Sequence, residues 1–301
     1  MPETKTPENF DLSAAANSSS LKTRSEALDA FLACSDAQKG ASALKLLQTP
    51  YKDLSEAVLQ ACTADIVNPP EFRHALTDAL DDVRNSDNDN YRQLFIVLLQ
   101  RLEKPLERPL LDFCLAALHA SSNDVRYQAF CLAELKDTDT PEYLDFVRSA
   151  LTDSDEDIRI VAIQAIERLR PEWGLQALNA RRDAVFGTEA CHLLITLLKL
   201  CPDSERAQTA GELTPFLNDD RFAFAVFQAL ADHGTPDVVP HILPHAKSFF
   251  SEPTIRVAAA YAAAKLGSSE GLNILKKLSE SRHGNPKYAQ ALLAELSKTA
   301  T

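Results

Sequence analysis

The residues best suited to metal or acid–base chemistry stand at 151–157, where LTDSDED places four carboxylates in seven positions. An aliphatic run, IRIVAIQAIERL, follows directly. A calcium loop needs oxygen ligands at alternate positions, a central glycine and a closing glutamate about twelve residues on. The segment lacks the last two. Since Asp and Ser are good N-cap residues and acids suit the first turn of a helix, we interpret the segment as the start of a helix.

Histidine and cysteine offer a second possible chemistry. His241 and His245 are four residues apart with His233 nearby, a spacing that zinc tolerates. A proline between the first two and the absence of an adjacent carboxylate or cysteine ligand favour half-exposed helix residues instead. Cys191 precedes His192, but adjacent helical residues point about 100° apart, which disfavours a nucleophile–base pair. We therefore predict no catalytic residue and no metal ligand.

The six cysteines form no CxxC pair and stand mostly in apolar helical patterns such as LLDFCLAAL. This usage predicts buried, reduced thiols in a cytoplasmic protein. The polar N-terminus lacks the basic start and apolar core of a secretory signal. Residues 1–23 are rich in Ser, Ala and Pro and show no periodicity, so we expect a disordered tail there.

Charge and composition narrow the classes of function. The 31 Lys and Arg against 43 Asp and Glu give a net charge of −12, which would repel a phosphate backbone because no stretch gathers the basic residues. The 8 glycines form neither GxGxxG nor GxxxxGK. No run approaches the ~18 apolar residues of a membrane span. We predict no cofactor, no nucleic-acid partner and no membrane span.

A helical segment led by an arginine recurs along the chain. Its copies are DNDNYRQLFIVLLQRL, SSNDVRYQAFCLAEL, SDEDIRIVAIQAIERL and EPTIRVAAAYAAAKL, and their arginines are Arg92, Arg126, Arg159 and Arg256. The separations are 34, 33 and 97 residues, the last being close to three periods of roughly 32. Weaker copies without the arginine fill the gap near Cys191 and Ala223, and NPKYAQALLAELS adds a closing helix.

The apolar positions follow a helical stripe at −1, +2, +3, +6, +7 and +10 from the arginine. Many of them are alanines, which let helices approach closely in a stacked array. A second helical segment precedes each copy, for instance PEYLDFVRSAL or SEGLNILKKL, so the repeating unit is a helical hairpin.

The repeats resemble the HEAT-repeat family, in particular the short bacterial type with PBS-lyase-like repeats that read D-x-D-x-x-V-R-x-x-A-x-x-A-L. The match is close at 155–166 and 123–132, fair at 89–102 and 252–266, and poor before about residue 85. In such proteins an aspartate and an arginine tie neighbouring repeats together. The resemblance therefore implies an inter-repeat ladder made of Arg92, Asp124, Arg126, Asp157, Arg159 and Arg256.

Enzymes built on similar repeats differ from this chain in their sites. Deoxyhypusine hydroxylase binds iron through His-Glu dipeptides, and none of the seven histidines here precedes a glutamate. Alkylpurine DNA glycosylases grip DNA through a basic surface, which the net charge of −12 disfavours. Phycobilin lyases share the scaffold, and no local feature excludes them.

A second apolar line runs at +1 and +4 from the arginine position. It packs against the next hairpin or else forms a groove on the concave face. For the groove, the candidate protein-binding residues are four of its large side chains with an acidic rim: Tyr127, Phe130, Ile163, Phe227, Glu134 and Glu167.

The sequence thus predicts an all-α, right-handed α-solenoid over residues 24–299 as one continuous domain, with atypical capping repeats before about 85 and after about 283. We favour a non-enzymatic, cytoplasmic adaptor that binds another protein, and the net charge of −12 favours a basic partner. The alternative is a maturation factor of the phycobilin-lyase type that acts on a cofactor-bearing protein.

Overall fold

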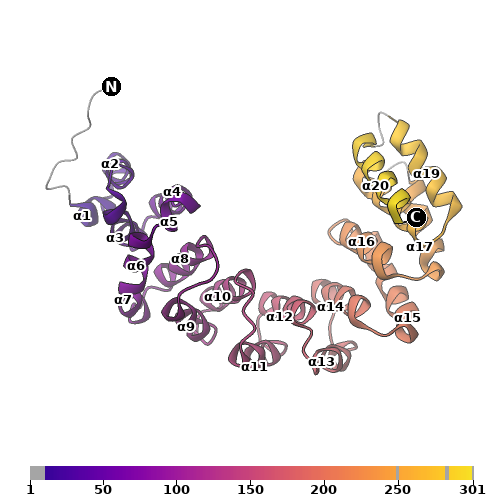
Figure 1. The fold of residues 1–301 in the computed structure, drawn as a ribbon, viewed down its shortest axis with the longest axis horizontal. Coiled ribbons are helices and arrows are strands. Elements are labelled where there is room, and N and C mark those ends of the chain that lie inside the picture. The colour runs from indigo at the N-terminus through magenta and orange to yellow at the C-terminus, as the bar shows by residue number, and fades with distance from the viewer. Residues whose placement is uncertain (1–10, 249–250, 282–284, 300–301) are drawn as a thin grey trace. The chain divides into compact units, whose positions relative to one another are not determined.

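The computed structural model describes residues 11–248, 251–281 and 285–299, and within these ranges it contains α-helices, 3-10 turns and no β-strand (Figure 1). The predicted all-α solenoid class is confirmed. None of the helices in these ranges combines the length and the apolar character that a membrane crossing requires. The chain divides into two compact units, residues 1–149 and 150–301, and the single continuous domain stays a prediction.

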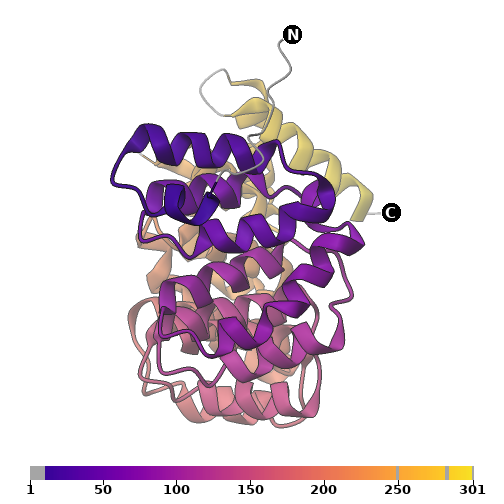
Figure 2. The same cartoon turned by 90° about the vertical axis from the view of Figure 1, so that its left-hand side faces the viewer.

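Ten helices lie wholly within the described residues of unit 1, seven of them before the clear repeats begin, and Figure 2 shows the indigo to purple helices lying in successive layers. The helices are α1 (Leu12–Ala16), α2 (Leu21–Leu32), α3 (Asp36–Leu47), α4 (Lys52–Ala61), α5 (Ala64–Val67), α6 (Pro70–Asp78), α7 (Leu80–Arg84), α8 (Asp89–Gln100), α9 (Arg108–Ala117) and α10 (Asn123–Leu135). Helix α11 (Pro141–Ala150) ends at the first residue of unit 2.

Unit 2 repeats the helical hairpin more regularly. Its elements are α12 (Glu156–Leu169), α13 (Gly174–Arg181), α14 (Gly187–Leu200), α15 (Asp203–Leu213), η1 (Thr214–Asn218), α16 (Ala223–His233), η2 (Pro236–Val238), α17 (Val239–Lys247), α18 (Pro253–Lys265), α19 (Ser269–Glu280) and α20 (Pro286–Thr299). Helices α14 and α16 are the two weaker repeat copies, and α20 is the expected closing helix. Successive even-numbered helices of unit 2 contact one another, and we call them the even row.

The predicted disordered tail is wrong for residues 11–23. The Asp11 carboxylate accepts hydrogen bonds from two backbone N–H groups at the start of α1, and Ala15 and Ala16 are buried. The Thr49 hydroxyl donates to the carbonyl of Ala16 at 2.6 Å, which attaches α1 to the end of α3. Packing of small alanines supplies the order that a composition rich in Ser and Ala does not predict. Residues 1–10 lie outside the described part of the chain.

The acidic segment starts a helix, as its sequence indicates. Asp155 is the N-cap of α12, and its carboxylate accepts hydrogen bonds from the backbone N–H groups of Asp157 at 2.9 Å and Ile158 at 3.4 Å. The Asp153 carboxylate in turn accepts from the N–H of Asp155 at 2.9 Å. These side chains satisfy donors that the first turn leaves unpaired. The stripe behind them is buried from Ile158 to Ile166.

Arg159 joins neighbouring repeats, but its carboxylate partner differs from the expected one. Its Nε donates to Glu189 on α14 at 2.8 Å, and Arg181 at the end of α13 donates to the other oxygen of Glu189 at 2.7 Å. Glu189 is only 4% exposed. Asp157 lies exposed on the first turn of α12. A glutamate on α14, in the next repeat, therefore takes the role that the resemblance assigns to Asp157.

Two other arginines of the expected ladder, Arg92 and Arg126, make contacts close to them in the chain. Arg92 pairs with Asp89 one turn earlier in α8 at 2.6 Å. Arg126 donates to the carbonyl of Ala120 in the preceding loop at 3.2 Å, and Asp124 is exposed. The Nε of Arg256 is buried without a hydrogen-bond partner among the described residues. The resemblance does not determine which partner each of these residues has, and the full ladder stays a prediction for the six residues that it names: Arg92, Asp124, Arg126, Asp157, Arg159 and Arg256.

Candidate functional site

The three histidines considered for a zinc site, His233, His241 and His245, lie in different local environments. His245 on α17 packs edge-on against Phe227 with ring centroids 5.6 Å apart, and burial lowers its pKa. His241 is exposed, and the half-buried His233 also has a pKa lowered mainly by burial. Within the described ranges, no three His, Cys, Asp or Glu side chains are grouped as they would be to hold a metal ion.

Three of the four predicted anchors are core residues. Phe130, Ile163 and Phe227 are fully buried, so the prediction that they form an exposed surface is wrong. Phe130 packs edge-on against Tyr143 and Phe146 of α11, with ring centroids 5.7 and 5.1 Å apart. The +4 position therefore packs against the first helix of the next hairpin, which is the first of the two alternatives for this line.

Three of the +1 positions differ from the +4 positions because they remain partly accessible, whereas Val257, at +1 from Arg256, is fully buried. Tyr127, Ile160 and Phe224 are half-buried. Phe224 on α16 lies 6.5 Å from the ring of Tyr288 on α20, across the alanine-rich α18. Only this part of the second apolar line can reach a partner.

The two glutamates predicted for the acidic rim form contacts with other residues of this chain. Glu134 accepts a hydrogen bond from the Tyr143 hydroxyl within unit 1. Glu167 forms an ion pair with Lys199 of the next repeat at 2.6 Å and also accepts from Thr196 at 3.3 Å. Glu167 therefore belongs to a pattern of charges that links repeats, which the sequence analysis did not identify.

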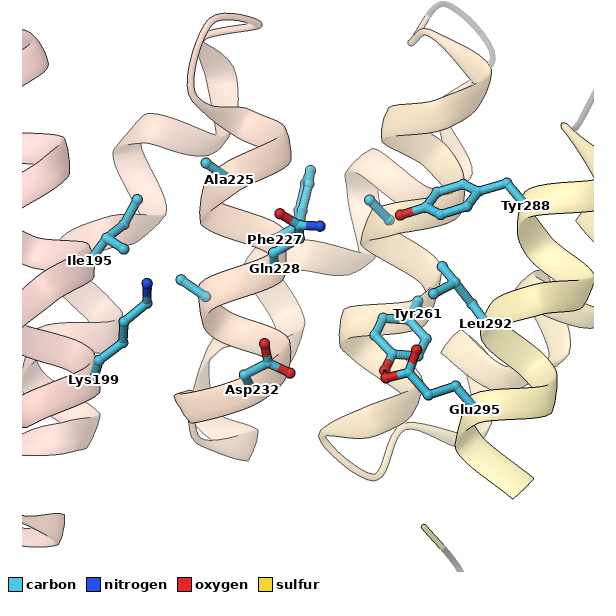
Figure 3. A pocket seen from close by; sticks show the side chains of 12 residues that line it. Ile195, Lys199, Ala225, Phe227, Gln228, Asp232, Tyr261, Tyr288, Leu292 and Glu295 are labelled. Atoms are coloured by element: carbon cyan, nitrogen blue, oxygen red, sulfur yellow. Dashed lines mark hydrogen bonds between the residues drawn. The ribbon is translucent and has the colours of Figure 1, made fainter. Parts of the chain in front are cut away.

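A groove opens over the even row of unit 2, with a volume of about 360 Å³ (Figure 3). Its floor is α18, where Ala258 and Tyr261 are nearly buried, and its walls belong to α14, α16 and α20. Alanines at 225, 229 and 258 leave the space that larger side chains would fill. Because the lining comes from four helices, the groove exists only when the repeats are stacked.

One end of the groove is apolar and aromatic. Tyr288 and Leu292 are half-buried on α20, and Ile195 is half-buried on α14 at the opposite side (Figure 3). Burial raises the pKa of the Tyr288 hydroxyl, so this group stays protonated at neutral pH. A tyrosine of this kind offers both an apolar ring and a hydrogen-bonding hydroxyl to a ligand.

The other end of the groove is charged. Five side chains of alternating sign occupy equivalent positions on the five helices of the even row, and we call them the charge row: Glu167, Lys199, Asp232, Lys265 and Glu295. Lys265 lies 2.6 Å from Asp232 and 4.0 Å from Glu295. Burial alone would lower the pKa of Lys265, but its hydrogen bonds and nearby charges, led by Asp232, raise it.

Tyr261 connects the floor of the groove to the charge row. Its hydroxyl donates to Glu295, and Lys265 lies 5.5 Å from its ring centroid. Burial, assisted by the hydrogen bond with Glu295, raises the pKa of Tyr261, which keeps the donor protonated. Neighbouring members of the charge row stand 30 to 33 residues apart, so a search for charges at the repeat period could have found them.

Comparisons with known proteins give a fold and no family. No family model and no curated protein matches the chain. Among solved structures, Kap121p, a HEAT-repeat karyopherin, is similar with a TM-score of 0.53 at 14% identity over 93% of this chain. A Kap121p mutant gives a TM-score of 0.54 at 13% identity over 93% of this chain. The chain spans 35% of the length of Kap121p in both cases.

An engineered protein is also similar, with a TM-score of 0.49 at 17% identity over 95% of this chain and 88% of that one. The likeness to Kap121p shows an all-α repeat fold of the HEAT kind. The short bacterial HEAT type indicated by the repeat pattern stays a prediction.

Proposed function

We propose that the chain is a protein-interaction scaffold that binds a segment of a partner polypeptide in the groove of unit 2. The observation that carries this proposal is the lining of the groove, in which half-buried Tyr288, Leu292 and Ile195 stand beside exposed charges. Partly exposed aromatic and aliphatic side chains with a polar edge are typical of protein-binding surfaces. The likeness to a HEAT-repeat karyopherin supports a scaffold role.

The charge distribution supports a partner that is basic overall. Residues 1–149 contain 15 Lys and Arg against 24 Asp and Glu, and residues 150–301 contain 16 against 19. The excess of acids is therefore concentrated in unit 1. A field of this sign attracts a basic protein and accelerates its association, an effect that added salt weakens.

Site-specific photo-cross-linking tests the proposal. Ala225 is exposed on the groove wall of α16, and Ala207 is exposed on α15, outside the groove. A photoreactive amino acid at position 225 should give a discrete adduct with a polypeptide in the cell that makes the protein, whereas position 207 should give none. Equal labelling from both positions, or no polypeptide adduct from position 225, would reject the groove as the binding site.

A further inference from the structure

The charge row ends in unmatched negative charge. It contains three carboxylates and two ammonium groups, and Lys199 is engaged by Glu167 at 2.6 Å. Among the members of the charge row, all of which lie in the described residues, Lys265 is the one ammonium group within 4.0 Å of both Asp232 and Glu295. Both carboxylate side chains remain more than half exposed, at 54% and 53%. One additional cation at this end would pair with them, whereas an additional carboxylate would be repelled.

The apolar end of the groove and this acidic end lie on one side of α20. Tyr288, Leu292 and Glu295 follow one another at intervals of four and three residues, so they share a face of the helix (Figure 3). At 1.5 Å per residue, Tyr288 and Glu295 are separated along the axis by about 10 Å. An extended chain covers this length in about three residues, at ~3.3 Å for each.

From this geometry we infer that the groove receives an extended partner segment in which a large apolar side chain and, about three residues away, a lysine or arginine enter together. The apolar side chain packs over the alanine floor between Tyr288, Leu292 and Ile195. The cation reaches Asp232 and Glu295. This inference rests on the proposed function and adds the chemistry of the partner segment to it.

The test uses a random library of twelve-residue peptides displayed on phage and selected on the full chain. Enriched peptides should combine an aromatic or large aliphatic residue with a basic residue two to four positions away. The best of them is then synthesised with a fluorescent label, and its affinity is measured by anisotropy for the chain and its variants. Replacing the basic residue of this peptide by glutamine should weaken binding about fivefold or more.

Two pairs of variants separate the groove from the rest of the surface. Ala225→Trp fills the groove and should weaken binding more than about tenfold, while Ala207→Trp on α15 should leave it unchanged. Glu295→Gln should weaken binding about fivefold, while Glu270→Gln, which removes the same charge from α19, should not. Unchanged circular dichroism shows that each variant is folded.

The outcomes distinguish the partner chemistry from the scaffold role. If Ala225→Trp blocks the selected peptides, but these lack a basic residue or bind Glu295→Gln equally well, the inferred cation is wrong and the groove remains a binding site. If the library yields no peptide that Ala225→Trp blocks, the inference fails. Cross-linking from position 225 then decides separately whether the groove binds a partner at all.

Discussion

At the scale of single residues, Glu189 is the most consequential charge in unit 2. It is 4% exposed and accepts one hydrogen bond from Arg159 and one from Arg181, so it joins three successive helices. Arg159→Ala should lower the free energy of unfolding by about 1–3 kcal/mol, because a buried carboxylate loses a charged donor.

Arg92→Ala is the matched control. Arg92 occupies the equivalent repeat position, but its ion pair with Asp89 is local and partly exposed, so the loss should stay below about 1 kcal/mol. Urea denaturation of both variants measures the difference. Equal losses would show that the arginine stabilises its own helix and not the contact between repeats.

Buried thiols give a second prediction at this scale. Burial raises the pKa of Cys62 to about 11 and those of Cys114 and Cys191 to about 12. Because the thiolate is the reactive form, these three should not react with a disulfide reagent at pH 8 in the folded chain.

The half-buried Cys34 and Cys131 should account for the thiols that react before unfolding, and all six should react in denaturant. Absorbance of the released thiol follows both reactions, and Cys34→Ser should remove one reactive group. Rapid reaction of Cys114 in the native chain would contradict the described packing.

At the scale of helices, the repeat period could be predicted from the sequence, because an arginine and an aliphatic stripe recur at each helix start. The sequence could not predict which side chains remain accessible to a partner. The +1 and +4 positions carry similar apolar residue types, yet Tyr127 is half-buried while Phe130 is fully buried against α11. That difference depends on the rotation of each helix against the first helix of the next hairpin. The groove could not be predicted from the sequence for the same reason. Alanines at 225 and 258 fit the pattern of ordinary core residues, and the space beside them appears only when four helices are stacked.

Close approach of α18 and α19 yields a prediction at the scale of helices. A Cβ atom on Gly271 would stand 2.7 Å from the Cβ of Ala263 and 2.8 Å from the backbone nitrogen of Ala264. Gly271→Ala should therefore destabilise the chain by about 1–3 kcal/mol, because backbone atoms must move apart.

Gly211→Ala in α15 is the opposite case, since nothing lies within 4 Å of the added methyl group. This variant should be stabilising by up to about 1 kcal/mol, because alanine is the better helix former. Thermal midpoints of the two variants should shift in opposite directions. A stabilising Gly271→Ala would contradict the close contact of these helices.

At the scale of the whole molecule, a stack of repeats transmits destabilisation through nearest neighbours, because each hairpin contacts mainly the next. The contacts of α3 with α6 and of α8 with α10 hold unit 1, whereas those of α12 with α14 hold unit 2.

Glu189→Ala removes the acceptor shared by two arginines and should lower the local stability of unit 2 by about 3 kcal/mol. Amide hydrogen exchange under native conditions should then accelerate about a hundredfold in α12 to α14. Exchange in α3 and α6 should stay unchanged. Phe72→Ala, which opens a cavity at a fully buried position of α6, should give the reverse pattern. Equal acceleration in both units by either variant would instead mean that residues 24–299 unfold as one cooperative domain, as the sequence pattern predicts.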